Sequence, residues 1–130
     1  MDVHTPLLPP GRTGLSDIIL YRKHLKTING YAHLSDKERK RVIDLYDGEI
    51  AFFDSHLNTI LEYVPEDTAI IFTADHGDEF GEDGQYGHHD KDIDVLRWVP
   101  LFVHIPGKQT ERHRFFDFMN FDKMIESLIK

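Results

Sequence analysis

The chain contains no cysteine among its 130 residues, which excludes disulfide bonds, thiolate zinc sites and cysteine nucleophiles. It also lacks an apolar run of the roughly 20 residues that cross a bilayer. Its first residues are polar and rich in proline, unlike a signal peptide. We therefore expect no membrane segment in this chain, and these absences favour the cytoplasm as its location.

Positive charge is scarce as well. The chain has 15 basic and 23 acidic residues, for a formal net charge of -8. Nucleic acids and anionic membranes bind clusters of Lys and Arg, so we expect neither as the main partner. An anionic substrate would need a metal ion or local positive charge to offset the acidic field.

One long helix is predicted between residues 35 and 64. Ser35 and Glu38 form a capping box, in which each side chain satisfies a free backbone amide of the first turn. Apolar side chains then recur every three or four residues, forming one stripe on a helix of about eight turns. The stripe consists of Ile43, Tyr46, Ile50, Phe53, Leu57, Ile60 and Val64. Pro65 ends the helix.

The remaining segments predict an α/β domain. Residues 1–16 are punctuated by proline and glycine and indicate a loop, and residues 17–34 suggest a short helix followed by a turn. Residues 68–74 and 99–107 are apolar along their length, which is typical of strands buried on both faces of a parallel sheet. Residues 120–130 predict a final amphipathic helix. This order indicates a mostly parallel sheet flanked by helices.

Residues 73–89, TADHGDEFGEDGQYGHH, concentrate the reactive side chains. Asp75 and His76 follow directly after the first predicted strand, where ligands gather in open α/β sheets. At such a bend a carboxylate and an imidazole can bind one cation. Ca²⁺, Mg²⁺ or Mn²⁺ fits if carboxylates dominate, and Zn²⁺ or Mn²⁺ fits if imidazoles do. Four glycines then allow tight turns before His88 and His89.

These residues also have ordinary interpretations. An Asp-His-Gly triplet is often only the exit from a strand, and His88–His89 alone would fit a surface pair. We interpret Asp78–Glu79 as charges that stabilise the loop and Glu82–Asp83 as solvated loop charges.

The segment nevertheless resembles the second metal-binding segment of the sulfatases, a family of the alkaline-phosphatase-like superfamily. In that family a strand is followed by Asp-His-Gly or Asp-Asn-Gly and by a glycine-rich loop that ends in His or Lys. The likeness continues in order along nearly the whole chain. DVHTPLLPP is similar to the family's His-x-Pro segment, YDGEIAFFDSHLNTIL to its preceding helix, LRWVPLFVHIPG to its Arg-Val-Pro-Leu strand, and FDFMNFDKMIESLI to its next strand–loop–helix step.

The resemblance implies a role for four residues. Asp75 and His76 would be ligands of a catalytic divalent cation, with Ca²⁺ expected ahead of Mn²⁺, Mg²⁺ or Zn²⁺. His88 and His4 would bind the ester and assist the departing oxygen. The implied activity is hydrolysis of a sulfuric ester, and the implied partner is a sulfate-ester or phosphate-ester small molecule or glycan.

Two features depart from the family pattern. The family nucleophile comes from Cys or Ser in a Cys/Ser-x-Pro-x-Arg motif, and none of Ser16, Ser35 and Ser55 has that context. Residues 1–130 are therefore expected to be a single partial domain, the C-terminal portion of a catalytic domain that is inactive alone. Trp98 separates Arg97 from Val-Pro-Leu, so we interpret Arg97 as structural.

Two other classes of function stay open. A phosphodiester or phosphonate monoester hydrolase, or a phosphoethanolamine transferase, would belong to the same superfamily and differ in its nucleophile. A non-catalytic metal-binding or interaction domain would bind a cation without turnover. For any of these, a partial sheet exposes unpaired strand edges, which predicts self-association.

Overall fold

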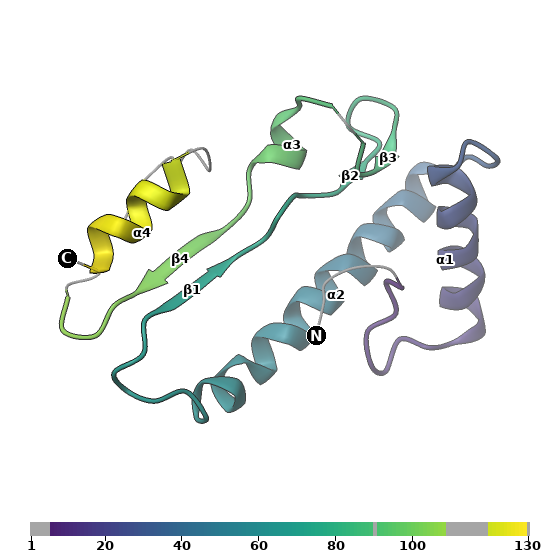
Figure 1. Ribbon diagram of the computed structural model, residues 1–130. Helices are drawn as coiled ribbons and strands as arrows, with labels where there is room; N and C mark the ends of the chain where they lie inside the picture. Colours follow the sequence, from purple (N-terminus) through teal and green to yellow (C-terminus); the bar gives the residue numbers. More distant parts are fainter. Residues whose placement is uncertain (1–5, 90, 109–119, 130) are drawn as a thin grey trace. The chain divides into compact units, whose positions relative to one another are not determined.

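The computed structural model describes residues 6–89, 91–108 and 120–129 and divides into two compact units (Figure 1). One unit comprises Met1–Tyr63 with Asp75–Val99, and the other comprises Val64–Ala74 with Pro100–Lys130. The elements along the chain are α1 (Leu15–Ile28), α2 (Asp36–Leu61), β1 (Ile70–Thr73), β2 (Glu79–Phe80), β3 (Tyr86–Gly87), α3 (Asp94–Arg97), β4 (Leu101–His104) and α4 (Phe121–Ile129).

The long helix predicted between residues 35 and 64 is confirmed as α2, although it ends at Leu61, before Pro65. Its capping box is present, because the Ser35 hydroxyl accepts from the Glu38 N–H and the Glu38 carboxylate accepts from the Ser35 N–H at 2.8 Å. The same carboxylate accepts from Lys23 Nζ of α1 at 2.7 Å. The Lys23 bond, followed by the Ser35 bonds, lowers the pKa of Glu38 to about 2. The start of α2 is thereby tied to α1.

The first unit is built on α1 packed against α2 (Figure 1). The predicted short helix and turn are confirmed, since α1 ends at Ile28 with Asn29 as its C-cap, and the chain turns at Gly30, whose φ of 75° suits glycine. The core residues are Leu7, Leu20, Val42, Leu45 and Phe80. Phe80 brings the β2–β3 hairpin into this core.

The β2–β3 hairpin is fixed on α2 by polar contacts as well. The Arg39 guanidinium donates to the Phe80 carbonyl and lies 3.6 Å from the Glu82 carboxylate. The Glu82 carboxylate in turn accepts from the Phe80 N–H at 2.6 Å. Glu79 is fully buried beside Phe80 and accepts from the backbone of the hairpin turn. The hairpin that carries the glycine loop therefore has a defined position in the first unit.

The second unit contains β1 and β4, which pair antiparallel, with Ile70 opposite His104 and Thr73 opposite Leu101. Side chains on both strands alternate between half-buried and exposed. The α/β class agrees with the sequence, but the expected parallel pairing with both faces buried is wrong for these two strands. An apolar run reports the hydrophobicity of a strand and not the direction of its neighbour. The intervening segment leaves β1 and enters β4 at the same end of the pair, which makes them antiparallel.

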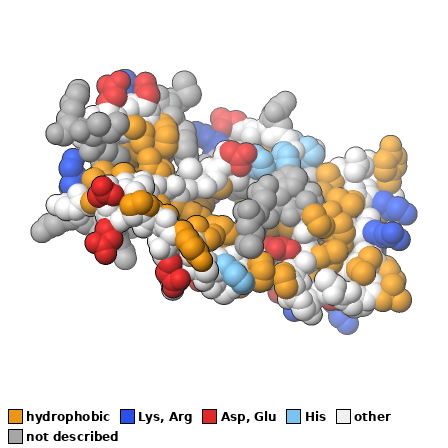
Figure 2. Space-filling model, turned by 60° about the horizontal axis from the view of Figure 1, so that its bottom comes forward, with side chains coloured by type: hydrophobic (Ala, Val, Ile, Leu, Met, Phe, Trp, Pro, Cys, Tyr) orange, Lys and Arg blue, Asp and Glu red, His pale blue; other side chains and the backbone are white. Residues whose placement is uncertain are grey.

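The predicted final helix is confirmed as α4. In the described part of the chain, no helix is both long and apolar enough to cross a membrane. Several large apolar side chains are exposed, and Figure 2 shows hydrophobic side chains at the surface. They include Leu15, Ile19, Tyr31, Ile50, Ile60, Tyr63, Ile71, Trp98 and Phe102.

Candidate metal centre

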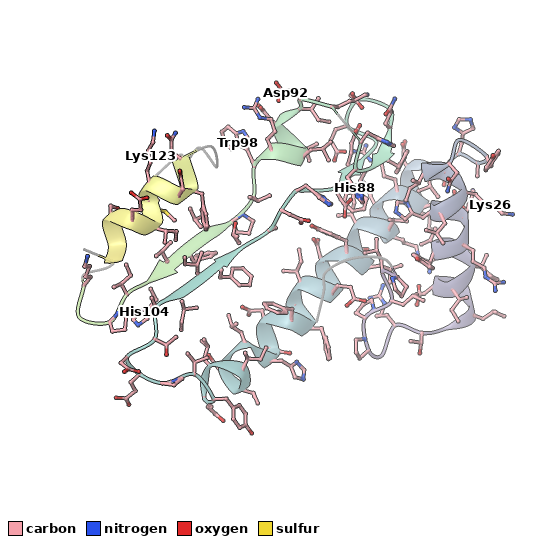
Figure 3. The ribbon with its side chains drawn as sticks, viewed as in Figure 1. Lys26, His88, Asp92, Trp98, His104 and Lys123 are labelled. Atoms are coloured by element: carbon pink, nitrogen blue, oxygen red, sulfur yellow. The ribbon has the colours of Figure 1, made fainter. Side chains whose placement is uncertain are left out.

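Three side chains of the glycine loop meet in the first unit. His76, Asp78 and His88 each offer one ligand atom, and these atoms all lie within 4.8 Å of one another. We call them the histidine–aspartate cluster. The two imidazole rings lie 4.1 Å apart, measured between centroids. Figure 3 labels His88, which directly follows β3.

Glycine at position 77 is required for the chain to pass through this cluster. A Cβ on Gly77 would lie 2.1 Å from the Val95 carbonyl oxygen, which is closer than atoms can approach. The Gly77 N–H donates to the Leu96 carbonyl at 2.9 Å. This close approach to α3 fixes the backbone between His76 and Asp78. Their side chains are two positions apart, a spacing that places them on the same side of extended chain.

The β2–β3 hairpin brings His88 back beside His76 and Asp78. Glu79 pairs with Gly87, so the residues just before β2 and just after β3 are neighbours. Gly87 has a φ of 81°, a backbone conformation that glycine adopts without strain. Gly81 has a φ of 98°, and a Cβ there would lie 2.9 Å from the Tyr86 hydroxyl oxygen. The glycines of the loop therefore allow the tight turns that the sequence predicts before His88.

The ring of His76 is oriented for cation binding. Its Nδ1 lies 2.9 Å from the Gly77 carbonyl oxygen. A carbonyl can only accept, so Nδ1 carries the proton and Nε2 presents its lone pair. A hydrogen bond of this kind to the second nitrogen is typical of histidines that bind metals. His76 Nε2 lies 3.8 Å from an Asp75 carboxylate oxygen, so both can approach one cation.

Asp75 is a negative group at the edge of this site. Its side chain is 90% exposed, and one oxygen accepts from the His76 N–H at 3.1 Å. Its own backbone N–H, followed by the positive charge of a protonated His76 ring, lowers the pKa of Asp75. The carboxylate is thus ionised at neutral pH, as cation binding requires.

Asp78 faces the ring of His88. A carboxylate oxygen of Asp78 lies 3.3 Å from His88 Nδ1, and the Asp78 side chain is only 20% exposed. The sequence suggested only a loop-stabilising charge at this position. The spacing of two residues from His76 was the available signal that it shares the same side of the chain.

The other predicted residues have separate positions. His4 lies outside the described residues. His89 directs Nε2 to the Tyr86 carbonyl at 2.8 Å, and Arg97 is an exposed residue paired with Asp92 at 2.9 Å. The structure thus brings Asp75, His76 and His88 together, and their roles as ligands or catalytic groups stay predictions. Two imidazoles and two carboxylates form a donor set that fits a divalent cation.

Comparison with known proteins identifies one family. The family model described as Sulfatase matches residues 20–128. Iduronate 2-sulfatase of Mus musculus is 26% identical over 116 residues, which cover 82% of this chain and 21% of that protein. Iduronate 2-sulfatase of Homo sapiens is 27% identical over 75 residues, which cover 54% of this chain and 14% of that protein. The chain therefore spans about a fifth or less of these relatives. No solved structure matches.

Proposed function

Since this chain belongs to the sulfatase family, we propose that it forms part of the catalytic domain of a metal-dependent sulfuric ester hydrolase. The observation that carries the proposal is the convergence of His76, Asp78 and His88 within 4.8 Å, just beyond a strand. The substrate class we propose is a sulfate-ester small molecule or glycan.

Asp75 and His76 are the proposed cation ligands, and we add the Asp78 carboxylate as a third ligand beside His76. A divalent cation bound here would polarise an ester oxygen and offset the charge of the sulfate group. We expect Ca²⁺ from the family. The His76 imidazole makes Mn²⁺ and Zn²⁺ its main competitors, since both ions accept nitrogen ligands readily.

His88 is the proposed proton donor to the ester. Its Nδ1 faces the Asp78 carboxylate at 3.3 Å, which holds the ring in one orientation. In the imidazolium form of the ring, Nδ1–H pairs with Asp78, and Nε2–H is the group that would donate to a sulfate oxygen or to the departing alcohol oxygen. Fixed donors at these oxygens stabilise the charge that develops as the ester bond breaks. We propose His4 as a second donor of this kind.

The nucleophile and the larger sheet are proposed to lie in other parts of the catalytic domain. None of the serines in this chain stands in the family's nucleophile motif. We propose that β1 and β4 join a mostly parallel, alkaline-phosphatase-like sheet in the complete domain. The isolated chain would then bind the cation and leave sulfate esters intact.

Calorimetric titration with Ca²⁺, Mn²⁺ and Zn²⁺ tests the cation site. His76→Ala and Asp78→Asn are each expected to lower the affinity by at least about 10- to 100-fold, because even the loss of an outer-shell partner of a ligand typically costs that much. The matched controls are His33→Ala and Asp92→Asn, because both side chains are exposed and lie outside the cluster. Equal affinity of the controls and of the cluster variants would contradict the proposal.

Sulfate chemistry needs its own test. A chain extended by its nucleophile segment is expected to hydrolyse an aryl sulfate, and His88→Ala should reduce turnover. Preferential cleavage of a phosphodiester by the extended protein would move the assignment to a phosphoryl hydrolase. Cation binding without any hydrolysis by that protein would favour a non-catalytic domain.

A further inference from the structure

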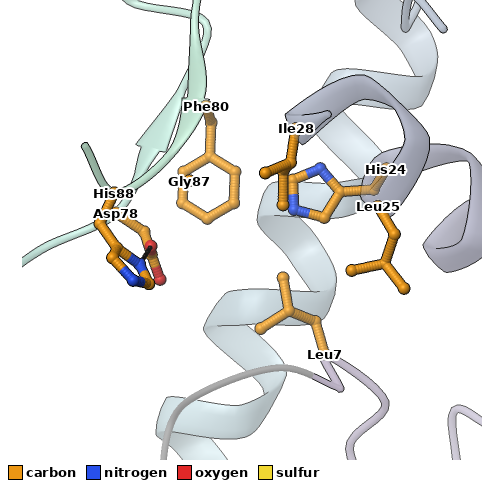
Figure 4. Close-up of a pocket in the computed structure, with 8 residues that line it drawn as sticks. All are labelled: Leu7, His24, Leu25, Ile28, Asp78, Phe80, Gly87 and His88. Atoms are coloured by element: carbon orange, nitrogen blue, oxygen red, sulfur yellow. Dashed lines mark hydrogen bonds and ion pairs between the residues drawn. The ribbon is translucent and has the colours of Figure 1, made fainter. Parts of the chain in front are cut away.

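A cavity of about 230 Å³ lies next to the histidine–aspartate cluster, within the first unit. Its walls are mostly apolar, and Asp78 and His88 form one side (Figure 4). The other lining residues are Leu7, His24, Leu25, Ile28, Phe80 and Gly87. An apolar cavity of about 150 Å³ holds benzene. This cavity therefore has room for one six-membered ring with substituents.

His24 is the polar group on the apolar side of the cavity. It is 2% exposed, and its ring stacks beside Phe80 and meets the edge of Tyr86, each with centroids 6.0 Å apart. Figure 4 shows the ring pointing into the cavity between Leu7, Ile28 and Phe80. Burial lowers the pKa of His24, and the Asp78 carboxylate opposes this only in part. The ring is therefore neutral at pH 7.

The neutral ring has a preferred position for its proton. Nδ1 of His24 is enclosed and has no hydrogen-bond partner among the described residues. In proteins, enclosed N–H groups without a partner are rarer than enclosed acceptors without one. The proton therefore belongs on Nε2, at the tip of the ring that faces the cavity. His24 thus offers one N–H donor inside an apolar space.

We propose that this cavity holds the alcohol part of the ester as a neutral six-membered ring, with an oxygen that accepts a hydrogen bond from His24. The identification of this ring as part of the ester rests on the proposed function. The apolar walls would contact the faces of the ring, while His88 and Asp78 lie at the side where the sulfate is attached. A polar group placed in an apolar pocket in this way usually fixes orientation and selects the ligand.

The charges around the cavity disfavour the binding of an anionic ring. In the metal-free chain, the Asp78 carboxylate borders the cavity, and the lining residues include no Lys or Arg that would offset a carboxylate on the ligand. A hydroxyl or ring oxygen can accept a hydrogen bond from the His24 N–H without adding charge. The predicted order of affinity is therefore a phenol-like ring first, then the same ring without its oxygen, with an anionic ring weakest.

The test is a titration of the ¹⁵N-labelled 130-residue chain with phenol, toluene and benzoate, without metal and with chelator, followed by nuclear magnetic resonance. Phenol is expected to shift the Ile28 and Gly87 amides and to bind about 3- to 10-fold more tightly than toluene, the effect of one hydrogen bond. Without a partner in the cavity, the phenol hydroxyl would be buried unpaired and toluene would bind better. Tighter binding of toluene or benzoate than of phenol would overturn the proposal, as would the absence of shifts at both amides.

Variants assign the selectivity to His24. His24→Phe keeps a ring against Phe80 and removes the N–H, so the preference should change from phenol to toluene. Leu25→Phe should fill the cavity and weaken both ligands. The matched control is Leu15→Phe, the same change on α1 at a side chain that is 75% exposed. The assignment would be overturned if His24→Phe still preferred phenol to toluene. It would also be overturned if Leu25→Phe and Leu15→Phe bound the two ligands with equal affinity.

These outcomes separate the inference from the proposed function. Phenol binding is measured without metal or sulfate, so loss of cation binding does not affect it. A chain that binds the cation and not phenol would retain the proposed function and lose this inference. A chain that binds phenol through His24 and no cation would lose the proposed function and keep a site for a neutral ring.

Discussion

Gly77 separates two members of the histidine–aspartate cluster, and its missing side chain lets the backbone lie against Val95. The Val95 carbonyl would be 2.1 Å from a Cβ, so Gly77→Ala must displace either the loop or α3. Such overpacking usually lowers the free energy of unfolding by about 1–3 kcal/mol. We expect that loss in urea denaturation, together with weaker cation binding because His76 and Asp78 separate.

The control for this prediction is Gly14→Ala. The nearest heavy atom to a Cβ on Gly14 is 3.8 Å away, an ordinary contact, so the loss should stay under about 1 kcal/mol, the range of a changed helix cap. Equal stability of the two variants would show that the loop has room at position 77.

At the residue scale, the sequence identified part of the site. The resemblance to sulfatases marked Asp75, His76 and His88, and the structure brings these three together. Asp78 was not selected because five carboxylates within residues 75–89 look alike in the sequence. His24 carried no motif, and its burial depends on packing between α1 and the hairpin, which local sequence does not encode.

At the element scale, the start of α2 depends on Glu38. Its pKa of about 2 in the folded chain lies below the usual value for a glutamate, with the Lys23 bond as the first cause. A carboxyl whose pKa is lower in the folded chain stabilises the fold at pH values above its pKa in the unfolded chain, which is about 4.3. This stabilisation is lost as the pH falls through the pKa of the folded chain. The difference in unfolding free energy between the unmodified chain and Glu38→Gln should therefore shrink from pH 7 to pH 2.

Urea denaturation at pH 7, 4 and 2 measures that difference. Lys23→Met removes the leading cause of the pKa shift, so in its background Glu38→Gln should have a smaller effect at pH 7. A difference that stays constant with pH would show that the carboxylate gains nothing from its partners on folding.

The elements themselves were mostly predictable, while their pairing was not. Ser35 and Glu38 specify the start of α2 through local bonds, so its cap could be foreseen from four residues of sequence. The apolar runs of β1 and β4 indicated strands correctly. They could not indicate antiparallel pairing, because that direction depends on the path of the segment between them.

At the scale of the whole molecule, exposed apolar surface predicts self-association. β1 and β4 form a two-stranded sheet in the described part of the chain, and Phe102 is 66% exposed on it. Such edges and faces pair readily with other chains. We expect sedimentation velocity to show concentration-dependent association that Phe102→Ser weakens. Tyr63→Ser, which changes an 85% exposed side chain outside the sheet, should weaken it less. A monodisperse monomer at all concentrations would contradict this prediction.

Binding of Mn²⁺ shows whether the histidine–aspartate cluster holds a divalent cation. This paramagnetic ion broadens nuclear magnetic resonance signals near its binding site, so a titration of the ¹⁵N-labelled chain locates the site without mutation. We expect the amides of Asp75–Asp78 and His88 to broaden first, at substoichiometric Mn²⁺, and excess Ca²⁺ to restore them. Uniform broadening over the acidic surface, or first broadening at carboxylates remote from this cluster, would contradict it.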